Sequence, residues 1–161
     1  MKQLTIIRHA KAERPEEHPL DFDRPLTKRG HKEAKATGKR LLMLEPAVDW
    51  LLSSPAVRAR QTTEELIRVC KYPLTIQWQA EIYEASVEQL LELMRNVPQD
   101  MEHVVLVGHN PGLTELVSIL STGDAARLNL HLPTAGLATL ELEIFWWNQL
   151  RWGCGRLLQL S

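Results

Sequence analysis

Two histidines stand directly after short apolar runs, and their side chains could do chemistry at one place. Leu4-Thr5-Ile6-Ile7 leads through Arg8 to His9, and Val104-Val105-Leu106-Val107 leads through Gly108 to His109. Continuous apolar runs of this kind are typical of strands buried in a parallel sheet. Because ligands collect outside the carboxyl ends of such strands, we expect the two imidazoles to share one pocket.

Two arginines add positive charge to the expected pocket. Arg8 comes immediately before His9, and Arg58 follows the segment Ser53-Ser54-Pro55. A serine cap and a proline at the first helical position predict that a helix starts there. Arg58 would then lie about one turn inside this helix and point back over its start, where it could meet an anion.

The segment after His109 predicts a second helix start. Asn110 is expected to cap this helix, with Pro111 at its first position. Free backbone N–H groups and the positive end of the helix dipole would then lie beside His109. With two guanidiniums and no evident carboxylate cluster, the pocket suits a tetrahedral dianion such as phosphate, which guanidiniums bind bidentately. We expect Arg8, Arg58, His109 and Asn110 to bind it.

Three motifs lie in order along the chain: Arg8-His9-Ala10, Leu52-Ser53-Ser54-Pro55 followed by Arg58-Ala59 and Gln61-Thr62, and Val107-Gly108-His109-Asn110-Pro111-Gly112. In this order and spacing they resemble the histidine phosphatase superfamily, which is also called the phosphoglycerate-mutase-like fold. The resemblance covers nearly the whole chain. More narrowly, the chain is similar to the SixA-type phosphohistidine phosphatases. That likeness rests on the short length, on Ala10 in place of the commoner glycine, and on Asp23-Arg24-Pro25-Leu26-Thr27 and Arg29-Gly30.

The resemblance implies a phosphatase that works through a phosphohistidine formed on His9. It implies that Arg8, Arg58 and His109 bind the phosphoryl group. The chemistry of the residue types agrees, because a neutral imidazole, with an ordinary pKa of ~6.5, is a nucleophile near pH 7 without a separate base. Most of the catalysis would then be positioning and charge stabilisation, so we expect no metal and no cofactor.

The proton donor to the leaving group is less clear from the sequence. Members of the family usually carry a carboxylate for this step, and we expect Glu81, which falls roughly where many members carry it, with Glu84 as the rival. A leaving imidazole is less basic than an alkoxide, so hydrolysis of phosphohistidine needs less acid assistance than hydrolysis of an ester. The short segment between Glu81 and the strand at 103–108 leaves no room for a capping subdomain, so we expect an open pocket that admits a phosphoprotein.

Other interpretations stay open at this point. The favoured substrate is phosphohistidine on a protein such as a phosphotransfer domain; a small-molecule phosphomonoesterase and a catalytically silent phosphate-binding adaptor are the alternatives. Asp21 and Asp23 could join the histidines as metal ligands, but the motif arginines would oppose a cation. The other four histidines are interpreted as surface or loop residues: His18, His31, His103 and His131.

The elements that must position these residues alternate between strand-like and helix-like segments with short connections, which is typical of a wound, mostly parallel sheet. We expect an α/β fold of the phosphoglycerate-mutase type, as one domain over residues 1–161, with helices on both faces of the sheet and no large capping subdomain. A long loop is expected over 10–27, at the rim of the site. The expected strands are 4–7, 49–52, 74–78, 103–108, 136–145 and 149–158, the last two antiparallel, and the expected helices are 30–44, 55–69, 87–96 and one that opens at Pro111.

Composition narrows the classes of protein that fit. The formal charge of −1 gives no global attraction to nucleic acid or to an anionic membrane. No apolar run approaches the ~20 residues of a membrane-spanning helix, and no apolar signal region precedes the first strand. Cys70 and Cys154 lack motif spacing. We therefore expect a soluble cytoplasmic protein with free thiols and no nucleic-acid or membrane partner.

Overall fold

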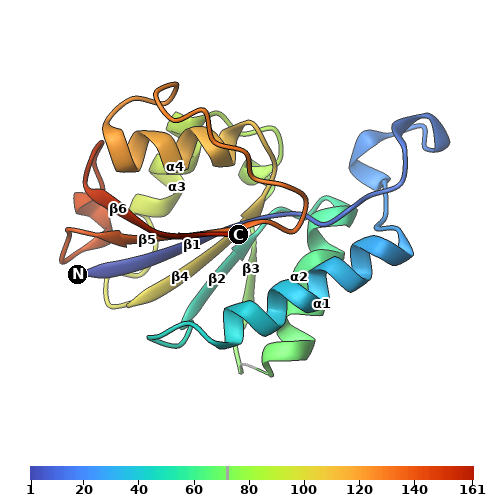
Figure 1. The fold of residues 1–161 in the computed structure, drawn as a ribbon, viewed down its shortest axis with the longest axis horizontal. Coiled ribbons are helices and arrows are strands. Elements are labelled where there is room, and N and C mark those ends of the chain that lie inside the picture. Colours follow the sequence, from blue (N-terminus) through green and yellow to red (C-terminus); the bar gives the residue numbers. More distant parts are fainter. Residues whose placement is uncertain (72) are drawn as a thin grey trace.

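Six strands form one sheet in the order β3-β2-β4-β1-β5-β6 in the computed structural model, which describes residues 1–71 and 73–161 (Figure 1). Strands β3, β2, β4 and β1 run parallel, β5 is antiparallel to β1, and β6 is antiparallel to β5. The strands are β1 (Lys2–Arg8), β2 (Trp50–Ser53), β3 (Ile76–Trp78), β4 (His103–Gly108), β5 (Leu137–Leu142) and β6 (Gly155–Leu160).

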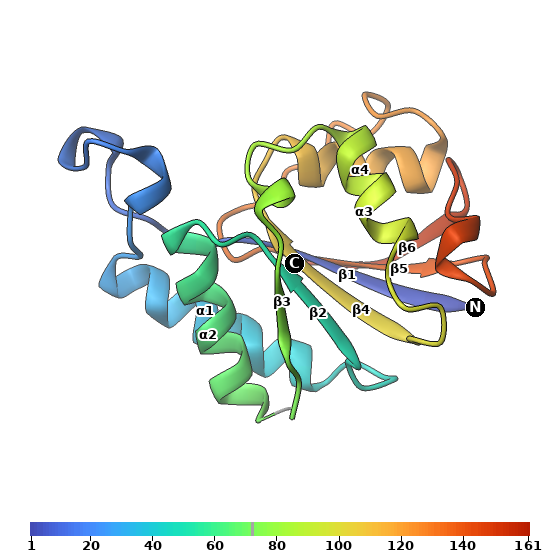
Figure 2. The same cartoon turned by 180° about the vertical axis from the view of Figure 1, so that it is seen from behind.

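Helices cover both faces of the sheet, with α1 and α2 on one face and α3 and α4 on the other (Figures 1 and 2). They are α1 (Lys28–Leu42), α2 (Val57–Cys70), α3 (Val87–Arg95) and α4 (Gly112–Thr122). Strand alternation explains the two layers: Leu4 and Ile6 of β1 pack with α3 and α4, whereas Ile7 packs with α1 and α2. The predicted α/β architecture, a mostly parallel sheet with helices on both faces, is confirmed.

The register of three strands brings the motif residues to one edge of the sheet. Arg8 at the end of β1 lies opposite Gly108 of β4, and the His9 amide donates to the Gly108 carbonyl at 3.1 Å. Ser54 follows β2, and its amide donates to the carbonyl of Val107 at 3.1 Å. Ser54, His109 and His9 therefore directly follow three adjacent strands and lie at the same end of the sheet.

Several boundaries differ from those predicted. Helix α1 begins two residues before Gly30, because the Thr27 side chain accepts from the Gly30 amide and caps it. Helix α2 begins at Val57 and has no side-chain cap. The last strand runs over Gly155–Leu160 and not over 149–158, since residues 147–149 form a short 3₁₀ turn with the Trp147 side chain buried.

The long loop after β1 contains two 3₁₀ turns, η1 (Pro15–Glu17) and η2 (Asp21–Asp23), and extends away from the rest of the molecule (Figure 1). Its base is closed by an antiparallel bridge between Ala12 and Leu26. The Leu26 amide also donates to Gln61 Oε1 of α2 at 2.7 Å. Helix α2 thus fixes the returning end of the loop beside the sheet.

His103 is a correction to the sequence interpretation, which placed it on the surface or in a loop. It begins β4, and its side chain is fully buried. Its Nδ1 lies 2.6 Å from the Pro46 carbonyl oxygen, and its Nε2 lies 2.8 Å from Thr5 Oγ1. These two partners satisfy the ring. Within the described residues, every helix is too short or too polar to cross a lipid bilayer.

Candidate functional site

His9 is held in one tautomer with a lone pair facing Arg58. The ring is buried, and its Nδ1 lies 2.8 Å from the carbonyl oxygen of Ala10. A carbonyl oxygen only accepts, so Nδ1 carries the proton. Arg58 Nε–H donates to His9 Nε2 at 3.3 Å, which leaves Nε2 unprotonated. Burial, reinforced by the neighbouring arginines, lowers the pKa of His9 to about 4.

His109 lies beside His9, with the two ring centroids 5.2 Å apart. Its Nε2 is 2.8 Å from Ser54 Oγ, the hydroxyl that also accepts from the Ala56 amide at the approach to α2. Its Nδ1 is buried and has no hydrogen-bond partner among the described residues. Burial, together with His9 and Arg58, lowers the pKa of His109 to about 3, so both rings are neutral near pH 7.

Arg8 and Asn110 are joined through one backbone carbonyl. Arg8 Nη1 and Asn110 Nδ2 each donate to the Leu132 oxygen, both at 3.2 Å. Arg8 Nε and Asn110 Oδ1 are buried without a partner in the described part of the chain. Asn110 is not the helix cap that the sequence predicted, because α4 begins at Gly112 with Pro111 before it and no side-chain cap.

Arg58 lies on the first turn of α2, as predicted, and its side chain is buried. It contacts a residue that the sequence analysis weighed only as a metal ligand. Arg58 Nη1 donates to the Asp21 carbonyl oxygen at 2.8 Å, and Nη2 donates to Asp21 Oδ2 at 3.0 Å. Tyr83 O–H and Arg24 Nε–H also donate to the Asp21 carboxylate. A side chain in a long loop carries no periodic signal, so only the charged composition of the segment could have pointed to it.

These residues surround two adjacent hollows. The first, which we call the basic cavity, has a volume of about 260 Å³ and is lined by His9 and His109 together with four cationic side chains: Arg8, Lys11, Arg24 and Arg58. The second, which we call the adjoining hollow, has a volume of about 520 Å³ and shares Arg58, His109 and Asn110 with the first. Its other lining includes carboxylates and a phenol: Asp21, Glu84, Glu115 and Tyr83.

The two candidate proton donors lie in different places. Glu84 lines the adjoining hollow, which it shares with His109. Glu81 lies on the short 3₁₀ turn η3 (Ala80–Ile82) and lines a separate depression with Gln79 and Glu92. The structure therefore does not bring Glu81 to either hollow. Glu84 lies two residues after this turn with a backbone φ of 57°, in the left-handed region, so the chain changes direction between the two carboxylates.

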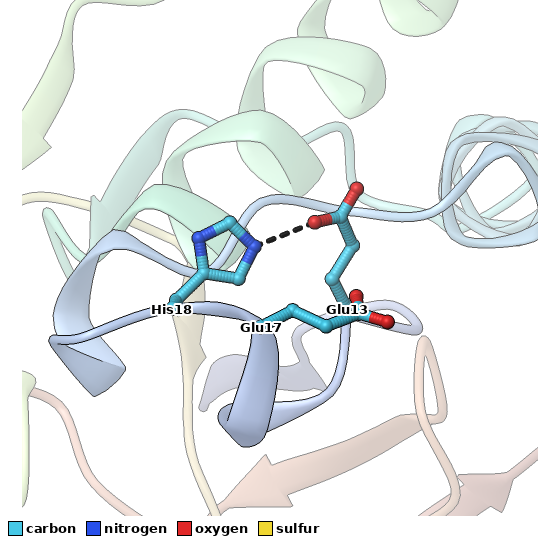
Figure 3. Close-up of side chains that lie close together, drawn as sticks. All are labelled: Glu13, Glu17 and His18. Carbon is cyan, nitrogen blue, oxygen red and sulfur yellow. Dashed lines mark hydrogen bonds and ion pairs between the residues drawn. The ribbon is translucent and has the colours of Figure 1, made fainter.

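One cluster outside the hollows has residue types that can bind metal ions. Glu13, Glu17 and His18 offer ligand atoms that all lie within 4.8 Å of one another (Figure 3). His18 Nε2 lies 2.6 Å from Glu13 Oε2, and the Glu17 carboxylate accepts from Arg14 Nη2 at 3.5 Å. The two carboxylates and the imidazole therefore lie close together because they form hydrogen bonds and ion pairs within the loop.

Comparisons with known proteins agree with this geometry. A family model of the histidine phosphatase superfamily (branch 1) matches residues 4–93. An uncharacterized protein of Mycobacterium tuberculosis H37Rv is 33% identical over 146 residues, covering 87% of this chain and 89% of the relative. An uncharacterized protein of Picosynechococcus sp. PCC 7002 is 32% identical over 140 residues, covering 86% and 84%.

Solved structures show the same fold over almost the whole chain. A candidate phosphohistidine phosphatase SixA from Nakamurella multipartitia is 27% identical with a TM-score of 0.86, over 99% of this chain and 95% of that one. A candidate SixA from Agrobacterium tumefaciens is 30% identical with a TM-score of 0.81, over 99% and 97%. A SixA complexed with tungstate has the same fold at 23% identity and a TM-score of 0.82, over 98% and 95%. The chain belongs to the histidine phosphatase superfamily.

Proposed function

We propose that the protein is a metal-independent phosphatase that removes the phosphoryl group from phosphohistidine on a protein substrate. When the phosphoryl group binds, the Arg58 Nε–H exchanges His9 Nε2 for a phosphoryl oxygen, and the freed lone pair of Nε2 attacks phosphorus. The bond to the leaving atom breaks at the same time, and its electron pair departs with the leaving atom. Water then attacks the phosphohistidine on His9, which returns an electron pair to Nε2 and releases inorganic phosphate. The observation that carries the proposal is the unprotonated Nε2 of His9 at a cavity lined by four cations.

Charge stabilisation supports this reaction. The transferring phosphoryl group carries its negative charge on three equatorial oxygens, and preorganised donors stabilise it. Arg8 and Arg58 supply guanidinium N–H groups at the basic cavity. Arg8 Nε and His109 Nδ1 are buried without partners among the described residues. A phosphoryl oxygen would accept from the Arg8 Nε–H and, in the tautomer in which the Ser54 hydroxyl donates to His109 Nε2, from the His109 Nδ1–H as well. Tungstate is a tetrahedral oxyanion, and its complex with a SixA of the same fold supports this use of the cavity.

The choice of phosphohistidine rests on the leaving group. An imidazole leaves with less proton assistance than an alkoxide, and Glu81 lies outside both hollows. The adjoining hollow of about 520 Å³ opens beside His109 and gives a protruding side chain on a protein room to reach the basic cavity. Likeness to two SixA structures at 27% and 30% identity supports the same class of substrate, such as a phosphotransfer domain.

One observation favours a second function, hydrolysis of small phosphate monoesters. Glu84 lines the adjoining hollow beside His109, where a carboxyl group could protonate an alkoxide. Rates on a phosphohistidine protein, phosphoramidate and an aryl phosphate, measured side by side, separate the two functions. The proposed function requires the highest kcat/KM on the phosphohistidine protein, whereas a higher value on the ester would contradict it.

The nucleophile is tested by the variant H9A. We expect turnover to fall by at least about a thousandfold and the acid-labile labelling of the protein by radiolabelled phosphoryl donors to disappear. H131A is the matched control, because His131 is exposed and lies outside the basic cavity. Substantial residual turnover in H9A would rule out this nucleophile. A wild-type protein that binds tungstate but turns over none of the three substrates would instead be a silent phosphate-binding module.

A further inference from the structure

The carboxylate of Asp21 joins three side chains at the edge of the basic cavity. Its Oδ2 accepts from Arg58 Nη2 at 3.0 Å and from the Tyr83 hydroxyl at 2.6 Å, and its Oδ1 accepts from Arg24 Nε at 2.9 Å. The Asp21 backbone oxygen accepts from Arg58 Nη1 at 2.8 Å. Three donors on one carboxylate make a fixed junction in a loop that otherwise extends from the molecule.

Charge explains why a carboxylate is useful at this junction. Arg24 and Arg58 both line the basic cavity with Arg8 and Lys11, so the cations repel one another when no anion is bound. The Asp21 carboxylate contacts both Arg24 and Arg58 and offsets that repulsion. Its hydrogen bonds from Tyr83 and Arg58 lower the pKa of Asp21 to about 2, so it stays ionised near neutral pH.

The contacts of Arg58 connect Asp21 to the nucleophile. A guanidinium has five N–H donors in a fixed planar fork. In the described residues, Nη1 and Nη2 each use one donor on Asp21, and Nε uses its donor on His9 Nε2. One N–H on each Nη is left for phosphoryl oxygens. Because the fork is rigid, the two contacts with Asp21 set the plane in which Nε meets His9.

We propose that Asp21 is a positioning residue of the phosphatase site, which orients Arg58 toward His9 and holds Arg24 and Arg58 together for the phosphoryl group. The proposal rests on the proposed function and adds a residue to it. Asp21 acts through the two guanidiniums and not on the reacting atoms. Its role differs from that of Asp23 on the same 3₁₀ turn, whose exposed carboxylate makes no hydrogen bond or ion pair in the described residues.

The loop has other attachments, so a change at Asp21 can be tested in a folded protein. Arg24 Nη1 donates to the Glu13 carbonyl at 2.9 Å, and the Leu26 amide donates to Gln61 Oε1 at 2.7 Å. Phe22 packs edge-on against the Tyr83 ring, with centroids 5.1 Å apart. None of these contacts uses the Asp21 carboxylate. We therefore expect D21N to keep the loop in place while it weakens the hold on the guanidiniums.

The experiment compares D21N with D23N, which removes the same charge two residues away. Tungstate binding is measured by calorimetry, and kcat and KM are measured on phosphoramidate. We expect D21N to bind tungstate about 10- to 100-fold more weakly and to lose kcat by a similar factor, as for a hydrogen bond to a charged group. D23N is expected to match the wild type, and both variants should keep the wild-type melting temperature.

A spectroscopic measurement separates positioning from a general structural effect. In the wild type, the Arg58 Nε–H should give a sharp, slowly exchanging NMR signal, because both ends of the guanidinium are held; R58K identifies the signal by its loss. D21N should broaden it, and D23N should not. Y83F removes one donor to Asp21 and should weaken tungstate binding by a smaller factor, about 2- to 10-fold. It provides the same test if D21N does not fold.

Two results with D21N would overturn the proposal. D21N that binds tungstate as tightly as D23N would show that Asp21 does not position the arginines. D21N that binds tungstate more tightly would show that Asp21 competes with the anion for Arg58. Tungstate binding needs no turnover, so this comparison remains decisive even if the wild-type protein hydrolyses none of the substrates and the proposed function fails. A wild type that does not bind tungstate would overturn both.

Discussion

In the proposed reaction, burial keeps the attacking nitrogen of His9 unprotonated, whereas a hydroxyl nucleophile needs a general base to remove its proton. The Ala10 carbonyl fixes the proton on Nδ1, and the lowered pKa keeps Nε2 unprotonated near pH 7. Arg8 and His109 could be predicted beside it from sequence, because they stand at the ends of buried strands, and Arg58 could be predicted there because Ser54 and Pro55 indicate a helix start. Asp21 could not, since its place depends on how a long loop folds back over α2.

The sequence left Glu81 and Glu84 as candidates for the proton donor to the leaving group, and a prediction at the scale of residues separates them. E84Q is expected to slow hydrolysis of an alkyl phosphate by about 100-fold, because Glu84 lines the hollow beside His109 and an alkoxide needs a proton as it leaves. Hydrolysis of phosphoramidate should change little, because its leaving nitrogen is already protonated in solution. Steady-state kinetics on both substrates measures the difference.

E88Q is the control for the E84Q experiment, since Glu88 lies exposed on α3 and lines neither hollow. The variant E81Q tests Glu81 as the alternative proton donor. If E81Q slows ester hydrolysis and E84Q does not, Glu81 reaches the substrate in spite of its position in a separate depression. Equal losses on the ester and on phosphoramidate in E84Q would contradict the argument from the leaving group.

At the scale of elements, sequence signals located the cores of the helices and strands better than their ends. The predicted helix 87–96 matches α3 closely, because Ser86 and Gln89 form a capping box. The final strand was misplaced because the segment around Trp147 serves a tertiary contact. The Trp147 indole N–H donates to the Met101 carbonyl at 2.8 Å and draws residues 147–149 into a turn. Such long-range contacts have no local signature.

A close approach between α1 and the loop after His9 gives an element-scale prediction. A Cβ added at Gly30 would lie 2.1 Å from the backbone oxygen of Lys11, which also accepts from the Thr27 amide. G30A is expected to destabilise the protein by about 1–3 kcal/mol, as overpacking does. It should also weaken tungstate binding, because Lys11 lines the basic cavity. Urea unfolding and calorimetry measure the two effects.

G38A is the matched comparison on the same helix. A Cβ at Gly38 would lie 3.0 Å from the Val69 side chain, a milder contact than the one with the Lys11 backbone. Alanine also gains about 1 kcal/mol in helix propensity over glycine. G38A should therefore be clearly more stable than G30A and bind tungstate normally. Similar stabilities for the two variants would mean that α1 can move away from the loop without loss.

At the scale of the whole molecule, three neutral histidine side chains lie at the two opposite ends of the parallel strands. His9 and His109 lie at its carboxyl edge, and His103 lies at the opposite end of β4. Burial lowers the pKa of all three, to about 4 for His9 and about 3 for His109. These three histidines therefore stay neutral in the folded protein at pH values, below about 6.5, at which they are protonated in the unfolded chain.

This linkage predicts that acid weakens the fold before carboxylates titrate. Below about pH 6.5 the unfolded chain binds more protons than the folded one, so the free energy of unfolding falls with decreasing pH. Each imidazole contributes up to about 1.4 kcal/mol per pH unit until its folded pKa is reached. Urea unfolding at several pH values between 7.5 and 5, in buffers without phosphate, measures the slope. In H9A this slope should be smaller by the contribution of one imidazole. A urea midpoint that does not change with pH would contradict the prediction, because the folded protein would then bind these protons as readily as the unfolded chain.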